Sequence, residues 1–142
     1  MNVGDIITRP LGTILPGAKL LDAAKLMVEQ NLGFLVVSDG RDKPKVVGVI
    51  SERDIIRSIA VGRTLNDSVD DVSTKRVITV KASSEVAEAA KAMNKNRIRH
   101  VVVVDDHGNL KGVVSMRDLV GERATLNAIL QSHEKEVFIG GD

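Results

Sequence analysis

The sequence contains no cysteine, tryptophan or tyrosine, and its only phenylalanines are Phe34 and Phe138. Without cysteine the chain has no disulfide bonds, no thiolate metal sites and no cysteine nucleophile. With so few aromatic rings it cannot build the stacking platforms that binders of single-stranded nucleic acid use. The core must therefore be built from valine, isoleucine, leucine, alanine and methionine.

Excess charge and long apolar runs are missing as well. The 20 basic and 19 acidic side chains leave a net charge of +1, so no large field attracts nucleic acid or an anionic membrane. No apolar run is long enough to span a bilayer, and the N-terminal residues MNVGDIITRP lack a signal-peptide core. We expect a soluble cytoplasmic protein in which a local cluster of cations binds any anionic ligand.

Familiar catalytic motifs are also missing. The sequence has no P-loop, no nucleophile elbow and no GxGxxG fingerprint, and no metal-ligand spacing relates its three histidines, which are His100, His107 and His133. Neighbouring carboxylates such as Asp70 with Asp71 and Asp105 with Asp106 sit at turns, where solvation explains them. The sequence favours a protein that is not an enzyme and holds no metal ion.

The chain does contain an internal repeat. A shift of 66 residues aligns Asp5 with Asp71, Thr13 with Thr79, Met27 with Met93, Val36 with Val102 and Asp39 with Asp105. After a hairpin loop that is two residues shorter in the second copy, a shift of 64 aligns Gly48 with Gly112, Ser51 with Ser115, Arg53 with Arg117 and Asp54 with Asp118. The sequence is therefore a tandem duplication.

Each copy is expected to contain the same elements in the same order. A short strand is followed by a helix with apolar residues at i, i+4 and i+7, by two apolar strands joined through a glycine-containing loop, and by a second helix. The strands are expected at residues 12–15, 34–38 and 45–50, and at 77–80, 100–105 and 110–114. The closing helices are expected at 52–62 and 116–130.

Half of this chain is too small to bury both faces of a three-stranded sheet alone. We therefore expect an α/β (α+β) fold in which two β-α-β-β-α repeats pack sheet to sheet with pseudo-two-fold symmetry and form two equivalent clefts. The first repeat is expected to span residues 1–66 and the second 67–124. A C-terminal helix extension and tail would follow at 125–142.

One motif ends both copies at the step from the third strand to the second helix. It reads GVISERD at residues 48–54 and GVVSMRD at residues 112–118. A serine followed three residues later by an aspartate fits a helix capping box, in which each side chain accepts a hydrogen bond from the other residue's backbone N–H. Capping alone would explain one copy, and for both it stays an open alternative.

This element order, with the motif at the end of both copies, resembles the cystathionine-β-synthase (CBS) domain pair, also called a Bateman module. The resemblance runs from about Val3 to about Val120, leaves no room for a catalytic domain and implies a stand-alone pair. It implies a regulatory, energy-sensing module that binds an adenosine nucleotide, with AMP expected first and ADP or ATP as further candidates. S-adenosylmethionine and NAD are the alternative adenosyl ligands.

The resemblance also implies roles for the motif residues. Asp54 and Asp118 would accept hydrogen bonds from ribose hydroxyls, and Ser51 and Ser115 would face the phosphates. A carboxylate can accept both hydroxyl donors of a cis-diol, and the N–H groups at a helix start favour phosphate. The adenine base would lie between aliphatic side chains, because this sequence offers so few aromatic rings.

The two copies differ where their second strands begin. The second copy has Arg99 and His100 at the positions of Gly33 and Phe34. Family members that bind AMP often carry arginine or histidine here, so the resemblance directs both side chains at a phosphate between the copies. The alternative is that Lys95, Arg97 and Arg99 form a solvated edge and that His100 only ends a strand.

The resemblance implies two pockets, each built from both copies. The pocket at Asp54 would also use Ser51, Val77, Ile78, Thr79, Ile98, Arg99, His100 and Arg117. The pocket at Asp118 would also use Leu11, Gly12, Thr13, Leu32, Ser115 and Arg53. Gly33 and Phe34 leave the second pocket without a basic residue at its strand entrance, so a less charged adenosine derivative, or nothing, is expected there.

A pure protein-interaction or dimerisation module that binds no ligand is the remaining alternative. The tail HEKEVFIGGD carries an apolar patch at Val137, Phe138 and Ile139 that a single chain does not have to cover. Family pairs commonly dimerise into a disc of four repeats, so a homodimer braced by this tail is expected.

Overall fold

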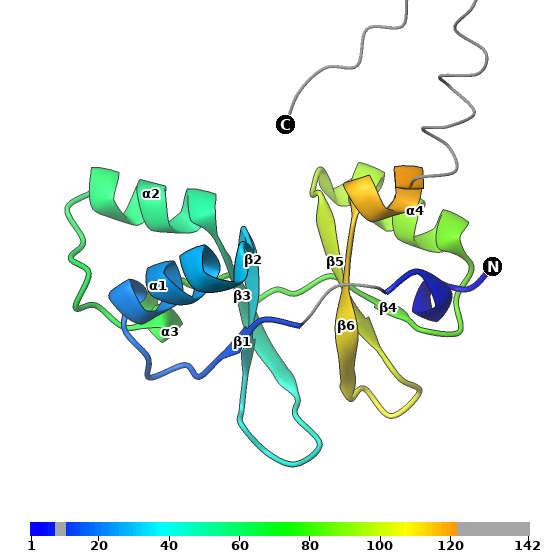
Figure 1. Cartoon of the computed structure of the whole chain (residues 1–142), viewed down its shortest axis with the longest axis horizontal. Coiled ribbons are helices and arrows are strands. Elements are labelled where there is room, and N and C mark those ends of the chain that lie inside the picture. Colours follow the sequence, from blue (N-terminus) through cyan, green and yellow to red (C-terminus); the bar gives the residue numbers. More distant parts are fainter. Residues whose placement is uncertain (8–10, 122–142) are drawn as a thin grey trace, which may run out of the picture.

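Two three-stranded sheets lie side by side in the computed structural model, which describes residues 1–7 and 11–121 (Figure 1). Helices cover the outer face of each sheet, and the inner faces of the two sheets meet. The expected extension and tail at residues 125–142, with the apolar patch, lie outside the described residues. The expected α/β fold of two packed repeats is confirmed.

The first repeat consists of β1 (Thr13–Ile14), α1 (Leu20–Gln30), β2 (Phe34–Ser38), β3 (Val46–Ser51) and α2 (Glu52–Ala60). The second consists of β4 (Thr79–Lys81), α4 (Val86–Asn96), β5 (His100–Val104), β6 (Leu110–Ser115) and a helix over residues 116–121, where the described chain ends. In each sheet the central strand pairs parallel with the first strand and antiparallel with the third. The two sheets thus share one topology.

The alternation of side chains along the central strands explains how each sheet buries both of its faces. In β2, Leu35 and Val37 pack beneath the helices of the first repeat, whereas Val36 joins the contact between the sheets. Val102 of β5 lies opposite in that contact and is 1% exposed. Because both faces of these strands are buried, their sequences are continuous apolar runs instead of alternating ones.

Two short helical turns were not predicted from the sequence. Each of them packs into the core of the repeat to which it does not belong in the sequence. They are η1 (Val3–Ile6) and α3 (Val69–Val72), which the shift of 66 residues relates to one another. Val3 donates its N–H to the carbonyl oxygen of Ser84 at 2.8 Å and lies in the core of the second repeat. Val69 donates to the carbonyl oxygen of Ala18 at 2.7 Å and lies in the core of the first. Each core is therefore completed by a residue that precedes the other repeat's first strand.

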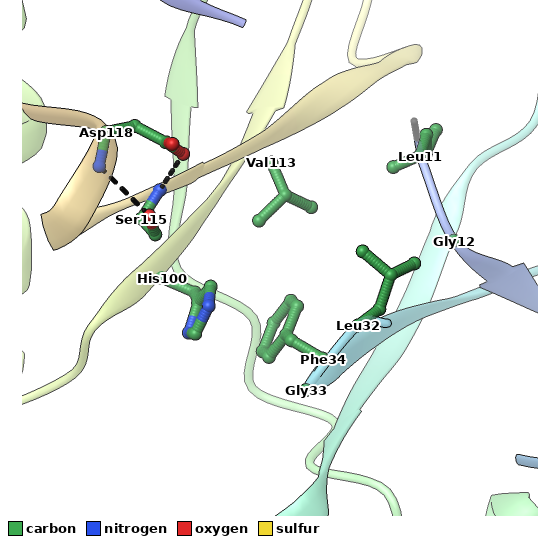
Figure 2. A pocket seen from close by; sticks show the side chains of 9 residues that line it. All are labelled: Leu11, Gly12, Leu32, Gly33, Phe34, His100, Val113, Ser115 and Asp118. Carbon is green, nitrogen blue, oxygen red and sulfur yellow. Dashed lines mark hydrogen bonds between the residues drawn. The ribbon is translucent and has the colours of Figure 1, made fainter. Parts of the chain in front are cut away.

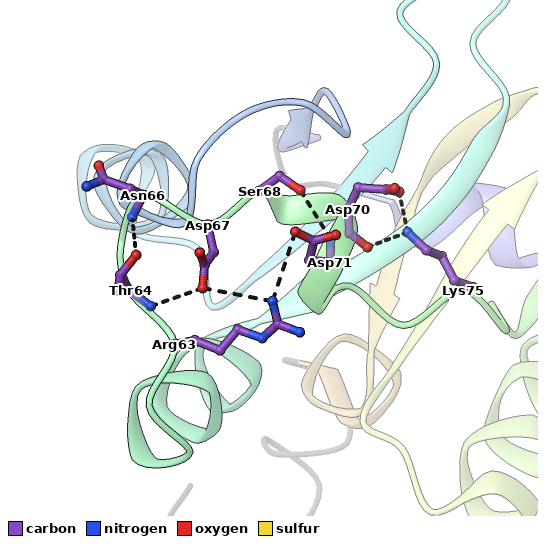
Figure 3. A network of polar contacts seen from close by, with 8 residues as sticks. All are labelled: Arg63, Thr64, Asn66, Asp67, Ser68, Asp70, Asp71 and Lys75. Atoms are coloured by element: carbon purple, nitrogen blue, oxygen red, sulfur yellow. Dashed lines mark hydrogen bonds and ion pairs between the residues drawn. The ribbon is translucent and has the colours of Figure 1, made fainter.

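Polar contacts hold the segment that leads into and out of α3 (Figure 3). The Arg63 guanidinium lies 3.9 Å from the carboxylate of Asp67 and 4.0 Å from that of Asp71, and Lys75 pairs with Asp70. Such exposed pairs contribute little individually, but together they engage each carboxylate of this acidic stretch. Within residues 1–7 and 11–121, no cluster of acidic, histidine or cysteine side chains could hold a metal ion.

The hairpin loops of the two repeats are closed by equivalent aspartates. Asp39 accepts hydrogen bonds from the backbone N–H groups of Arg41 and Lys45 at 3.2 and 3.1 Å. Asp105 accepts from those of His107 and Asn109 at 2.9 and 2.8 Å. The bond from Lys45 lowers the pKa of Asp39 and the bond from Asn109 lowers the pKa of Asp105, in each case more than any other cause. Both loops are thus closed by ionised carboxylates.

These lowered pKa values predict how stability depends on pH. A carboxyl group whose pKa is lower in the folded state contributes stability above its unfolded pKa, and this contribution is lost as the pH falls through the folded pKa. The affected range therefore starts at about pH 4 and extends downward. Replacing Asp39 and Asp105 by asparagine keeps an acceptor oxygen and removes the titration. Urea unfolding between pH 7 and pH 3 should show a smaller loss of stability in the double variant, and an identical loss in both proteins would contradict this.

Candidate functional site

The repeated motif forms a capping box in both copies. Ser51 donates its N–H to Asp54 Oδ2 at 2.8 Å, and the Asp54 N–H donates to Ser51 Oγ at 3.2 Å. The equivalent bonds between Ser115 and Asp118 measure 2.8 and 3.1 Å. Capping occupies one oxygen of each carboxylate. In the described chain no hydrogen bond reaches the other oxygen of Asp54, Oδ1, so capping leaves an acceptor available for a ligand.

Backbone bonds fix the strand entrances beside these helix starts. The Glu52 N–H donates to the carbonyl oxygen of Gly33 at 3.0 Å, and the Met116 N–H donates to that of Arg99 at 2.7 Å. The residues that differ between the copies therefore lie next to the motif in both repeats. This arrangement makes the two clefts unequal in chemistry although their backbones correspond.

The cavities at the two motifs also differ greatly in size. The cavity beside Asp54, called the Asp54 cleft below, has a volume of about 470 Å³. The cavity beside Asp118, called the Asp118 pocket, has a volume of about 40 Å³. Sites for small molecules and cofactors typically measure about 300 to 1,000 Å³. Only the Asp54 cleft falls within that range.

Aliphatic side chains close the Asp118 pocket (Figure 2). Leu11 and Leu32 point into the space across from Ser115 and Asp118, and a Cβ atom added at Gly12 would lie 2.6 Å from Leu32 Cδ1. Its lining comprises Leu11, Gly12, Leu32, Gly33, Phe34, His100, Val113, Ser115 and Asp118. Of the residues expected here, Thr13 and Arg53 are not part of that lining. No lysine or arginine lines the pocket among the residues that the structure describes.

The Asp54 cleft brings together most of the residues expected there. Its lining includes Ser51, Asp54, Val77, Ile78, Ile98, Arg99 and His100, but neither Thr79 nor Arg117. Arg53, expected at the other pocket, lines this cleft instead. It lies in the first turn of α2, directly before Asp54, and therefore belongs to the helix start of its own repeat.

Several lining residues of the Asp54 cleft were not identified from the sequence. They are Gly33, Phe34, Val49, Glu52, Arg57, Thr74, Arg76, Arg97 and Val102. Arg57 follows Arg53 by four residues in α2, and this helical spacing could have placed both on one face. The pattern of Lys95, Arg97 and Arg99 fits a solvated edge as well as a binding site, so it did not identify Arg97. Arg76 lies in the connection from α3 to β4, whose path follows from the exchanged turns and has no local sequence signal.

A stacked pair of rings lines both cavities. The rings of Phe34 and His100 lie 4.6 Å apart between centroids, with an interplanar angle of 6°. These residues occupy equivalent positions in the repeats, so the stack lies where the copies face one another. Both residues line both cavities, as Figure 2 shows for the Asp118 pocket. The stacked rings therefore contribute to the lining of both the Asp54 cleft and the Asp118 pocket.

Comparisons with known proteins agree with this architecture. The CBS domain model matches residues 3–61 and 69–124. An uncharacterised 17.7 kDa protein of Acidianus ambivalens is 39% identical over 118 residues, which cover 83% of this chain and 70% of that protein. Inosine-5'-monophosphate dehydrogenase of Methanocaldococcus jannaschii is 30% identical over 122 residues, but these cover only 23% of the enzyme. The region similar to this chain is therefore most of a small protein in one relative and a small part of an enzyme in the other.

Solved structures show the same fold. A CBS domain protein from Pyrobaculum aerophilum complexed with AMP superposes with a TM-score of 0.82 at 32% identity, covering 92% of this chain and 99% of that chain. The CBS domain pair of protein MJ0100, in complex with 5'-methylthioadenosine and S-adenosyl-L-methionine, gives a TM-score of 0.77 at 28% identity and covers 90% of this chain and 98% of that chain. Within the described residues, none of the helices has the length and apolar character to cross a bilayer. The chain belongs to the CBS domain family and carries two CBS domains in tandem.

Proposed function

We propose that this chain is a regulatory module that binds an adenosine nucleotide in the Asp54 cleft. The observation that carries the proposal is one cleft of about 470 Å³ that combines the Asp54 carboxylate, a helix start and several arginines. The complexes of the Pyrobaculum protein with AMP and of MJ0100 with adenosyl compounds support a ligand that contains adenosine. The Asp118 pocket is too small for a second nucleotide, so we propose one site per chain.

The chemistry of the cleft suggests how the nucleotide is held. The ribose hydroxyls would donate to Asp54 Oδ1, which capping leaves available. The aliphatic side chains of Val77 and Ile78 would contact the adenine base. The first phosphate would lie at the N-terminus of α2, near Ser51 and Arg99, where backbone N–H groups and a guanidinium favour an anion.

A nucleotide in this position would contact both repeats at once. Asp54 belongs to the first repeat, whereas Ile78 and Arg99 belong to the second. A ligand can shift the relative tilt of the two sheets only if it binds one arrangement better than another. Competition between nucleotides of different phosphate number for this cleft would then report the energy state of the cytoplasm. The proposal requires no catalytic group. The chain would act through a partner protein whose binding depends on the relative tilt of the two sheets.

Thermal unfolding in the presence of nucleotides tests the proposal. A ligand at 100 times its dissociation constant should stabilise the folded chain by about 2.7 kcal/mol, because it binds the folded state alone. We expect raised melting temperatures with adenosine nucleotides, and smaller shifts with guanosine nucleotides of the same charge and concentration. Unchanged melting temperatures across millimolar adenosine nucleotides would contradict the proposal and favour the ligand-free interaction module.

The charge of the cleft discriminates between the adenosyl ligands. S-adenosylmethionine carries a positively charged sulfonium, which five lining arginines would repel. A nucleotide phosphate or the pyrophosphate of NAD has the opposite charge. Among adenosyl compounds we therefore propose a phosphorylated one, and the thermal screen should include S-adenosylmethionine and NAD as comparisons.

Apolar side chains on equivalent helices support a homodimer. Ile56 of α2 and Val120 of the helix at residues 116–121 are equivalent in the two repeats, and they are 66% and 50% exposed. Both helices lie at the upper edge of the molecule in Figure 1. We propose that a second copy of the chain covers this edge.

Sedimentation tests this proposal through a charged substitution. Ile56→Glu should turn a dimer into a monomer at micromolar concentration, because the carboxylate would lose its hydration in the interface. Val47→Glu, at an apolar residue of β3 that is 37% exposed, is the matched control and should leave the dimer intact. A monomeric wild-type chain, or a dimer that tolerates Ile56→Glu, would contradict the proposal.

A further inference from the structure

Three arginines line the Asp54 cleft in addition to Arg53 and Arg99. Arg57 extends from α2, Arg76 from the connection between α3 and β4, and Arg97 from the C-terminal end of α4. All three side chains are exposed. Arg53, Arg57, Arg76 and Arg97 form no ion pair within residues 1–7 and 11–121, although the chain carries nearly as many acidic as basic residues. Their charges are therefore available to a ligand.

The charge of the cleft exceeds what a monophosphate neutralises. The lining contains five arginines and two carboxylates, those of Glu52 and Asp54, which is a formal excess of three positive charges. The whole chain has a net charge of only +1, so positive charge is concentrated in this cleft. A phosphate monoester carries about −1.5 to −2 charge at neutral pH. Bound AMP would leave part of the excess uncompensated.

The residues that line the Asp54 cleft come from different layers of the fold, so the cleft has an apolar inner part and a charged outer part. Val49, Val77 and Val102 belong to the cluster where the two sheets meet, so the inner part is apolar. Arg57 comes from α2 and Arg97 from the end of α4, both in the helical layers outside the sheets. A nucleotide whose base lies on the apolar part would therefore extend its phosphates toward the arginines.

We infer that the Asp54 cleft takes the diphosphate or triphosphate chain of an adenosine nucleotide, with Arg57, Arg76 and Arg97 binding the phosphates beyond the first. This inference rests on the proposed function and narrows its ligand class. Guanidinium groups bind phosphate oxygens bidentately, so three further arginines match the additional phosphates of ADP and ATP. The site prefers these nucleotides to AMP, in contrast to the expectation from the sequence.

Calorimetric titration of the full chain with AMP, ADP and ATP tests the inference. ADP or ATP should bind the wild-type chain at least about tenfold more tightly than AMP, because each hydrogen bond to a charged group contributes at least that factor. Arg57→Gln and Arg76→Gln should each weaken ATP about tenfold or more and change AMP affinity by less than about threefold. Raising the salt concentration should weaken ATP more than AMP.

The first repeat shows which residue can replace Arg97, the third arginine. Arg97 ends α4 in the left-handed region with φ of 53°, and the equivalent Asn31 ends α1 with φ of 52°. Arg97→Asn therefore removes the charge and keeps a residue that tolerates this conformation. Arg41→Gln removes the same charge from the hairpin loop, where the Arg41 side chain is 80% exposed, and serves as the control.

The outcomes separate this inference from the proposed function. AMP affinity equal to or higher than ATP affinity would overturn the inference and leave adenosine-nucleotide binding intact. So would equal losses of AMP and ATP affinity in the three variants, or an Arg41→Gln loss as large as theirs. Binding of none of the three nucleotides would overturn both. Tight ATP binding that falls selectively in Arg57→Gln, Arg76→Gln and Arg97→Asn would support the inference.

Discussion

Replacing Arg99 by glycine and His100 by phenylalanine should weaken nucleotide binding by about 1.5 to 3 kcal/mol, roughly ten- to 150-fold. The double variant gives the second repeat the residues that the first repeat has at Gly33 and Phe34. It removes a guanidinium that lines the Asp54 cleft and keeps an aromatic ring in the stack with Phe34. Both AMP and ATP should lose affinity, because we place Arg99 at the first phosphate.

Calorimetric titration alongside urea unfolding distinguishes a lost contact from a damaged fold. Residues 99 and 100 have the same place relative to the strand pairing as residues 33 and 34, so both substitutions introduce residues that the other repeat already has at the equivalent position. Unchanged affinity in a folded double variant would remove Arg99 and His100 from the site. A loss of affinity that only accompanies unfolding would show that the two residues act on stability instead.

The repeat and the apolar periodicity were sufficient to predict the order of the strands and the pairing of the sheets. Val36 and Val102, which the repeat aligns, are both buried where the two sheets meet. The exchanged turns were not predicted, because a four-residue turn such as α3 has no apolar period of its own. The contribution of Val69 to the first core is visible only in the structure, where it belongs to the same buried cluster as Leu20.

The candidate site was predictable where its residues belong to the motif or adjoin it. Ser51, Asp54, Arg99 and His100 meet in one cleft because the strand entrances are bonded to the helix starts. The difference in size between the two cavities was not predictable, since it depends on how Leu32 fills the space next to Gly12. The sequence did indicate the chemical difference, through the positions of Arg99 and Gly33.

The proposed function depends on the difference in volume and charge between the Asp54 cleft and the Asp118 pocket. The motif residues form the same capping bonds in both repeats, so the capping geometry does not distinguish a binding site from a helix start. Volume and charge differ between the two cavities and support the proposed site at Asp54, because that cleft is the larger one and is lined by arginines. The two aspartates should therefore respond differently to the same substitution.

Calorimetric titration of Asp54→Asn and Asp118→Asn with ATP is the most direct test of the central claim. Asparagine keeps one oxygen, which can accept the capping bond that Asp54 Oδ2 now accepts from Ser51 at 2.8 Å. Its amide NH₂ then replaces Oδ1 and cannot accept from a ribose hydroxyl. Asp54→Asn should weaken ATP by about 1.5 to 3 kcal/mol, the contribution of hydrogen bonds to a charged group. Asp118→Asn should leave the affinity unchanged. Unchanged affinity in Asp54→Asn, or a loss confined to Asp118→Asn, would contradict the account.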